Sequence, residues 1–157
     1  TCTMPNTNIA DYIKVEAIEL DLKSKNKNSV IKELYENIKK LGLVKDEEGA
    51  LKDLFAREEM GSTGIGKNVA LPHAKTDAVD ELIMTVGISR EGIEYGGIDE
   101  ENVNIFFMFL CPMDKTQEYL KTLARISRLI REDKFREKLI KSKTPNEIVE
   151  IILTEEK

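Results

Sequence analysis

The sequence predicts a single three-layer α/β domain, in which a mixed β-sheet carries helices on both faces. Residues 29–41 place apolar side chains at intervals of three and four, the pattern of an amphipathic helix. Residues 103–110 are nearly all apolar, which is typical of a central strand covered on both faces. Strand-like and helix-like segments alternate loosely along the chain, and this alternation favours a layered α/β architecture.

The first half of the chain is expected to form two helices and the first strands. The helix over 29–41 stops at Gly42, and a second helix begins at Asp46 and ends near residues 60–61. Three glycines within 61–66 predict a loop. The remaining sheet segments are a short strand over 69–71 that ends at Pro72, a strand over 82–89 and turns over 90–97.

The last third of the chain is expected to be helical. Helices are predicted over 116–131, over 134–141 and from Pro145 onward. Thr144 is the expected N-cap of the last helix, and Glu147 completes a capping box. The basic side chains of this region are interpreted as a solvated face and not as a nucleic-acid site: Arg125, Arg128, Arg131, Lys134, Arg136 and Lys138.

Composition and length restrict the class of protein. The 157 residues suit one domain over 9–157, preceded by a disordered start or an expression remnant over 1–8. The formal net charge of −5 comes from 29 acidic and 24 basic side chains, and it argues against a partner made of nucleic acid. Neither a metal nor a cofactor is expected.

Cysteine usage and hydropathy favour a cytoplasmic protein. The two cysteines, Cys2 and Cys111, form neither a disulfide scaffold nor a zinc-ligand pattern, so a reduced compartment is expected. The first twenty residues lack the features of a signal peptide. The longest apolar run, over 105–111, is too short to span a bilayer, so no direct membrane insertion is expected.

The segment over 57–73 carries the candidate chemistry. His73 is the only histidine of the chain, and a neutral imidazole is a nucleophile that needs no activating base near pH 7. Arg57 offers a fixed fork of donors that matches a phosphate group. Ser62 and Thr63 can donate hydrogen bonds to phosphate oxygens, and glycines such as Gly64 let backbone N–H groups approach an anion. His73 directly follows Pro72, so it is expected at a sheet edge, exposed to a partner and held rigidly.

Three simpler interpretations compete with this one. A lone histidine can be structural or merely exposed. The glycines can form only a tight turn, although this leaves Ser62, Thr63 and Arg57 unexplained. The segment 61–67 also fits most of a nucleotide-binding P-loop, but Asn68 stands where Ser or Thr would hold magnesium. The segment also follows a helix and precedes a strand, which is the reverse of the P-loop order.

These residues resemble the signature of a known family. Arg57-Glu58, the run over 61–66 and Leu71-Pro72-His73 are similar to the motif of fructose/mannitol-type enzyme IIA domains of the bacterial sugar phosphotransferase system. The loop is most similar to the nitrogen-regulatory branch, and the resemblance extends from about residue 9 to residue 153. The resemblance implies a mixed sheet flanked by helices, with His73 as phosphoryl acceptor, and it maps the family arginine onto Arg57.

The resemblance also implies a route for the phosphoryl group. The donor is phospho-HPr or its nitrogen-branch counterpart. In transport members the acceptor is a cysteine of a IIB domain, which implies a phosphotransferase component for fructose-type uptake. The alternative is a regulatory protein of the nitrogen branch, in which the phosphorylation state of His73 controls binding to target proteins.

Two positions depart from the family pattern. Many members have a second active-site histidine where this chain has Tyr119, and a phenol cannot carry the positive charge of an imidazolium. Ala74 stands where many relatives have glycine. A third hypothesis therefore stays open, namely a family member that has lost phosphotransfer and only binds partners.

Overall fold

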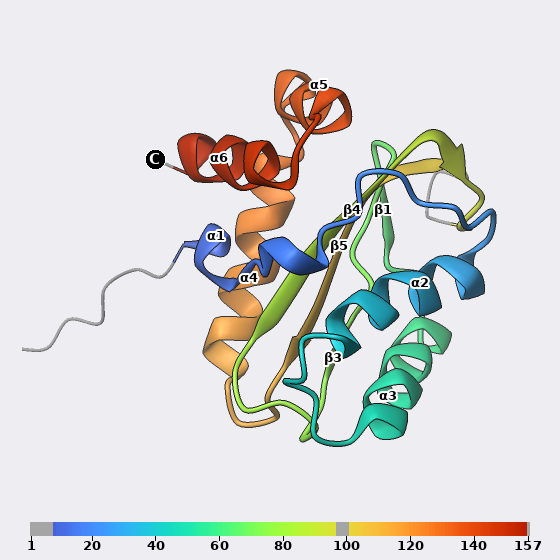
Figure 1. The fold of residues 1–157 in the computed structure, drawn as a ribbon, viewed down its shortest axis with the longest axis vertical. Coiled ribbons are helices and arrows are strands. Elements are labelled where there is room, and N and C mark those ends of the chain that lie inside the picture. The colour runs from blue at the N-terminus through green and yellow to red at the C-terminus, as the bar shows by residue number, and fades with distance from the viewer. Residues whose placement is uncertain (1–7, 97–100, 157) are drawn as a thin grey trace, which may run out of the picture.

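Strand β5 (Val103–Cys111) lies at the centre of the sheet, as the sequence predicts. The computed structural model describes residues 8–96 and 101–156, and Figure 1 shows their arrangement. On one side β5 pairs antiparallel with β4 (Ile83–Ile93). On the other side it pairs in parallel with two short strands, and a further strand extends the sheet: β2 (Val69–Ala70), β3 (His73–Lys75) and β1 (Gly64–Gly66).

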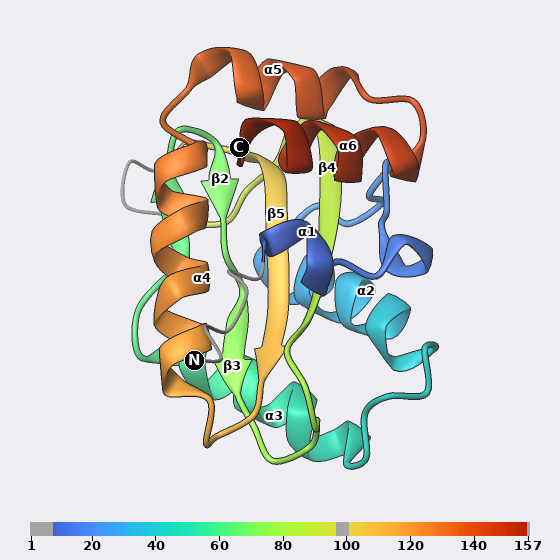
Figure 2. The same cartoon turned by 90° about the vertical axis from the view of Figure 1, so that its left-hand side faces the viewer.

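Helices cover both faces of this mixed sheet, so the predicted three-layer α/β architecture is confirmed. Two helices cover one face, α2 (Lys27–Lys39) and α3 (Glu47–Glu59). The other face is covered by α1 (Ile9–Tyr12), α4 (Thr116–Leu129), α5 (Asp133–Lys141) and α6 (Pro145–Glu155). Figures 1 and 2 show the two helical layers from perpendicular directions.

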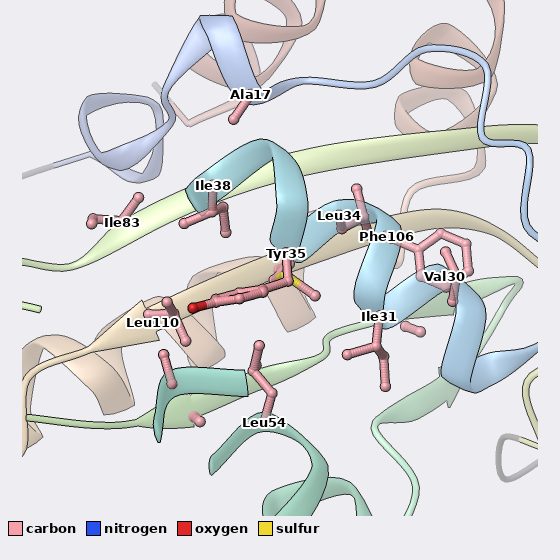
Figure 3. Close-up of a cluster of buried hydrophobic side chains, with 14 of the residues drawn as sticks. Ala17, Val30, Ile31, Leu34, Tyr35, Ile38, Leu54, Ile83, Phe106 and Leu110 are labelled. Carbon is pink, nitrogen blue, oxygen red and sulfur yellow. The ribbon is translucent and has the colours of Figure 1, made fainter. Parts of the chain in front are cut away.

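The alternation of side chains along β5 builds a separate core on each face. Phe107 and Phe109 point toward the layer of α4, α5 and α6, whereas Phe106 and Leu110 point toward α2 and α3. Figure 3 shows the second of these cores. The Tyr35 hydroxyl of α2 also donates to the backbone carbonyl of Glu47 at the start of α3 (2.5 Å), which ties the two helices together.

Two sheet segments differ from the sequence prediction. The turns expected over 90–97 are wrong for 90–93, because β4 continues to Ile93 through an irregularity in its pairing with β5. Gly92 adopts φ +89° there and donates its N–H to the Ser89 hydroxyl (3.1 Å), so the strand absorbs the glycine as a bulge. Residues 97–100 lie outside the described part. The loop over 61–66 is also shorter than expected, because β1 forms within it.

The β1–β2 connection explains the apparent P-loop. Lys67 (φ 56°) and Asn68 (φ 66°) both adopt left-handed backbone conformations between the paired residues Gly66 and Val69. Two central residues with positive φ form a tight hairpin of the I′ type. The glycines over 61–66 therefore lead into a β-hairpin and not into the strand-to-helix turn of a nucleotide-binding loop.

A segment that the sequence analysis left unassigned covers the outer edge of β4. Residues 13–26 bridge in parallel to Met84, Gly87 and Glu94, and the Lys14 N–H donates to the Met84 carbonyl (2.9 Å). The short α1 has Asn8 as its N-cap, and the Asn8 N–H donates to the Asp11 carboxylate (3.0 Å). An occupied edge is protected from pairing with other chains. The prediction for residues 1–7, including Cys2, lies outside the described residues.

The C-terminal helices agree closely with the sequence prediction. Thr144 accepts the N–H of Glu147 (3.2 Å) as the expected N-cap of α6. The Glu147 carboxylate accepts the N–H of Lys143 (3.1 Å), one residue earlier than a capping box requires. In the part of the chain that the structure describes, no helix combines the length and apolar character needed to cross a membrane.

Gly87 tests how tightly α2 packs against β4. A Cβ atom at this position would lie 2.7 Å from Cδ2 of Leu34 and 3.0 Å from Cδ1 of Leu22. We expect Gly87→Ala to lower the free energy of unfolding by about 1–3 kcal/mol in urea titrations, because the added methyl group overpacks the core. Leu34→Val should relieve part of the clash, so the double variant should lose less than the sum of the two single variants. Strict additivity would contradict this packing.

Candidate active site around His73

His73 begins β3 and lies at the edge of the sheet, as predicted. It pairs in register with Phe109 of β5, and its ring stacks on the Phe109 ring with centroids 4.9 Å apart and planes at 10°. The predicted exposure is wrong, since only 4% of His73 is accessible. The ring is buried because Phe109 lies on one side and Tyr119 of α4 approaches it, with ring centroids 5.5 Å apart.

Two hydrogen bonds determine which nitrogen of His73 carries the proton. Nδ1 lies 2.5 Å from the Leu71 carbonyl oxygen, which can only accept, so Nδ1 is the protonated nitrogen. In the neutral ring this leaves the lone pair on Nε2, which lies 3.0 Å from the Tyr119 hydroxyl and accepts a hydrogen bond from it. The Leu71 carbonyl is therefore the group that orients the imidazole, and no pattern in the sequence predicts this role.

The surroundings of His73 favour its neutral form. Burial lowers the pKa of His73 below its ordinary value of 6.5, and the bond to the Leu71 carbonyl opposes this effect. The positive charge of Arg57 lowers the pKa further, whereas the negative charge of Glu58 raises it. The net result is an imidazole that is uncharged at neutral pH and has one lone pair available.

Arg57 lies in the last turn of α3, next to the glycine-rich loop. Its Nη1 donates to the Gly61 carbonyl (3.0 Å), which fixes the start of the loop. Because its charge influences the pKa of His73, the guanidinium belongs to the same electrostatic environment. A guanidinium has five N–H donors, so this bond leaves others for an anion.

Ser62 and Thr63 have different surroundings although they are adjacent. The Ser62 hydroxyl oxygen accepts from the Gly64 N–H (3.1 Å) and from Lys27 Nζ (3.4 Å), so its own proton stays available. Thr63 is 3% exposed, and its hydroxyl donates to the Glu58 carboxylate (2.5 Å). The phosphate-binding roles of Ser62, Thr63 and Gly64 stay predictions, and the Thr63 hydroxyl proton is already used by Glu58.

A polar cluster that the motif does not predict lies next to this loop. Glu58 is 8% exposed and accepts four hydrogen bonds, from Thr63, Tyr95 and Lys27. Burial opposes ionisation of Glu58, but these donors together lower the pKa of its carboxyl group. Lys27 and Tyr95 are far from the motif in sequence, so only the position of Glu58 next to Arg57 could have indicated the cluster.

Lys75 and Thr116 help to position Tyr119. Lys75 Nζ lies 4.7 Å from the centroid of the Tyr119 ring and donates to the hydroxyl of Thr116 in the first turn of α4 (3.3 Å). The ammonium and the ring attract each other. The Tyr119 hydroxyl lies 3.0 Å from Nε2 of His73, which is 4% exposed, so Tyr119 covers this nitrogen.

Comparison with known proteins identifies the family. The family model described as "Phosphoenolpyruvate-dependent sugar phosphotransferase system, EIIA 2" matches residues 11–155. The chain therefore belongs to the EIIA 2 family of the sugar phosphotransferase system, as its loop and histidine predict. Proteins of this family are components of a phosphotransferase system.

Two relatives of similar sequence carry fructose-specific names. The chain is 30% identical over 149 residues to the "PTS system fructose-specific EIIA component" of Haloferax volcanii, covering 95% of this chain and 97% of that protein. It is 30% identical over 144 residues to the "PTS system fructose-specific EIIABC component" of Bacillus subtilis, covering 92% of this chain but only 23% of that longer protein.

A solved structure shares the whole fold. The nitrogen regulatory protein IIA-Ntr from Neisseria meningitidis aligns with a TM-score of 0.85 and 26% identity. The alignment covers 92% of this chain and 98% of that one. The predicted family and fold are thus confirmed, whereas the choice between a transport and a regulatory role is not made by these similarities.

The lowered pKa of His73 predicts an acid-sensitive fold. Below about pH 6.5 the unfolded chain protonates this histidine and the folded chain does not, so the free energy of unfolding should fall as the pH decreases. His73→Gln removes the group, so its stability should decrease less between about pH 7 and pH 5. Urea titrations at several pH values measure the difference. Equal slopes for the two proteins would contradict a depressed pKa.

Proposed function

We propose that the protein is a phosphocarrier that accepts a phosphoryl group on Nε2 of His73. The donor is phospho-HPr or its nitrogen-branch counterpart, and the acceptor is a cysteine of a IIB domain in fructose-type sugar uptake. In this role the protein works in the cytoplasm. The observation that carries the proposal is the neutral His73 ring, whose Nδ1–H is bonded to Leu71 and whose Nε2 holds the lone pair.

The proposed step needs little more than positioning. The Nε2 lone pair attacks phosphorus, the bond between phosphorus and the donor breaks, and its electron pair stays with the donor. The Nδ1 proton remains on its bond to Leu71 throughout. Tyr119 must turn its hydroxyl away from Nε2 before attack, and it can then donate to a phosphoryl oxygen.

The surrounding donors suit the charge of a phosphoryl group. Phosphorylation adds about 1.5 to 2 negative charges, by analogy with other phosphorylated side chains. Arg57 supplies a positive charge, and Ser62 supplies an unused hydroxyl proton. Thr63 already donates both its N–H and its hydroxyl to Glu58, so it would have to release one of these bonds to reach a phosphoryl oxygen.

Exposed apolar side chains near the site offer a surface for protein partners. Met60 follows α3 and is 83% exposed, and Leu120 lies next to Tyr119 with 57% exposed. Leu71, by contrast, is buried. Met60 and Leu120 are therefore our candidates for contacts with a protein partner.

Intact-mass measurement tests phosphoryl uptake directly. The purified protein, incubated with phosphoenolpyruvate, enzyme I and HPr or its nitrogen-branch counterpart, should gain one phosphoryl group that is lost in acid. His73→Ala should gain none, because the nucleophile is absent. Labelling of this variant would refute the assignment of His73. No gain by the wild-type protein with either donor would favour a family member that only binds partners.

A regulatory role in the nitrogen branch is the second candidate. The close structural similarity to IIA-Ntr, with nearly complete coverage of that chain, favours it. The name of the Bacillus relative, which joins A, B and C components, favours transport. Rapid transfer of the phosphoryl group from His73 to a purified fructose-type IIB protein would support transport and exclude a purely regulatory role.

Tyr119 should assist the transfer although it replaces a histidine. Tyr119→Phe keeps the ring beside Phe109 and Lys75 but removes the donor to a phosphoryl oxygen. We expect it to lower the rate of phosphoryl acceptance by about tenfold or more in quenched-flow assays. Tyr119→His should keep the rate, since imidazole can donate the same bond. An unchanged rate in Tyr119→Phe would show that the hydroxyl only shields Nε2.

A further inference from the structure

We propose that Glu58 is a positioning residue for His73 and acts on its imidazole through Thr63 and Leu71. The inference rests on the proposed function for its meaning in phosphoryl transfer. The hydrogen-bond partners of the Glu58 carboxylate are Thr63, Tyr95 and Lys27, and His73 is not among them. The carboxylate instead begins a continuous series of hydrogen bonds that ends at the Nδ1–H of His73.

Each bond of this series fixes the next group. The Glu58 carboxylate accepts the Thr63 N–H (2.9 Å) and the Thr63 hydroxyl (2.5 Å). The Thr63 carbonyl accepts the N–H of Leu71 (2.9 Å). The Leu71 carbonyl in turn accepts the Nδ1–H of His73 (2.5 Å). A displacement of Thr63 therefore moves Leu71, whose carbonyl selects the tautomer of His73.

Glu58 is well anchored at the start of this series. One carboxylate oxygen accepts from the hydroxyls of Thr63 and Tyr95 (2.9 Å), and the other accepts from the Thr63 N–H and from Lys27 Nζ (2.8 Å). Burial and the nearby Glu58 charge raise the pKa of Tyr95 far above its usual value, so its hydroxyl remains a donor. Lys27 belongs to α2 and Tyr95 follows β4, so the carboxylate connects the loop to both.

Removal of the Glu58 carboxylate would leave buried polar groups of the loop without hydrogen-bond partners. Without the carboxylate, the buried Thr63 N–H and hydroxyl lose their partner, and an unsatisfied buried donor is unfavourable. The loop must then shift to satisfy them elsewhere, and Leu71 moves with it. A weaker bond at Nδ1 allows the other tautomer, whose proton sits on Nε2, and this tautomer has no lone pair on Nε2 with which to attack phosphorus.

The single histidine of the chain makes the proposal measurable. Nitrogen-15 NMR of histidine-labelled protein reports the protonation of Nδ1 and Nε2 and the pKa of His73 without overlap from other histidines. Glu58→Gln should raise the fraction of the Nε2–H tautomer and lower the pKa of His73, because the negative charge that raises it is lost. The maximal rate of phosphoryl acceptance should fall about tenfold or more. The KM for the phosphorylated donor should change less than about twofold, since the buried Glu58 is not part of the surface that binds the donor.

Glu59→Gln is the matched control. Glu59 is the next residue of α3, is exposed and takes no part in the bonds described above. This variant makes the same change in net charge but leaves those bonds intact. It should therefore keep the tautomer, the pKa of His73 and the maximal rate of the wild-type protein. A shift of His73 as large as in Glu58→Gln would overturn the proposal, because a general electrostatic effect would explain both.

A second variant covers the case in which Glu58→Gln does not fold. Thr63→Val removes the hydroxyl but keeps its volume and the backbone N–H, so the tautomer shift should be in the same direction and smaller. A shift in Glu58→Gln alone supports the proposal and assigns the positioning to the Thr63 N–H. Wild-type tautomer and rate in every variant that folds would overturn it. If the wild-type protein accepts no phosphoryl group, the proposed function fails, whereas the tautomer comparison still decides the positioning role.

Discussion

The pairing of β5 with an interrupted neighbour is the constraint on which the site depends. β2 and β3 both run along the same side of β5, and Leu71 and Pro72 lie between them. Proline has no N–H to donate, and at this interruption the carbonyl of Leu71 bonds outside the sheet, to the side chain of His73. The Leu71 N–H is bound by Thr63 and its carbonyl by His73, so the break in the strand supplies the groups that orient the imidazole.

Much of this architecture follows from local sequence patterns. Helix α4 begins at Thr116 as predicted, and the apolar run over 103–110 forms the central strand because both its faces are buried. The edge position of His73 follows from Pro72. Its burial does not, because the exposure of a side chain at a sheet edge depends on what packs over it, here Tyr119 of a helix that follows much later in the chain.

The polar contacts of the site were harder to predict than its residues. Ser62 and Thr63 are equivalent as donors in the sequence, but the backbone directs one hydroxyl toward Gly64 and the other toward Glu58. The partners of Glu58 come from separate elements, α2 and the segment after β4. Such contacts depend on tertiary packing, which neither periodicity nor motif spacing encodes.

The burial of His73 also bears on how long a phosphorylated state would last. A phosphorus–nitrogen bond that is open to water is hydrolysed, and a carrier then loses the phosphoryl group before it reaches the acceptor. Packing between Phe109 and Tyr119 keeps water from the imidazole, and the same packing closes the path to an acceptor. In the proposed role, transfer of the phosphoryl group would therefore wait for a docked partner that displaces Tyr119. The protein would keep the group protected from hydrolysis until that partner binds.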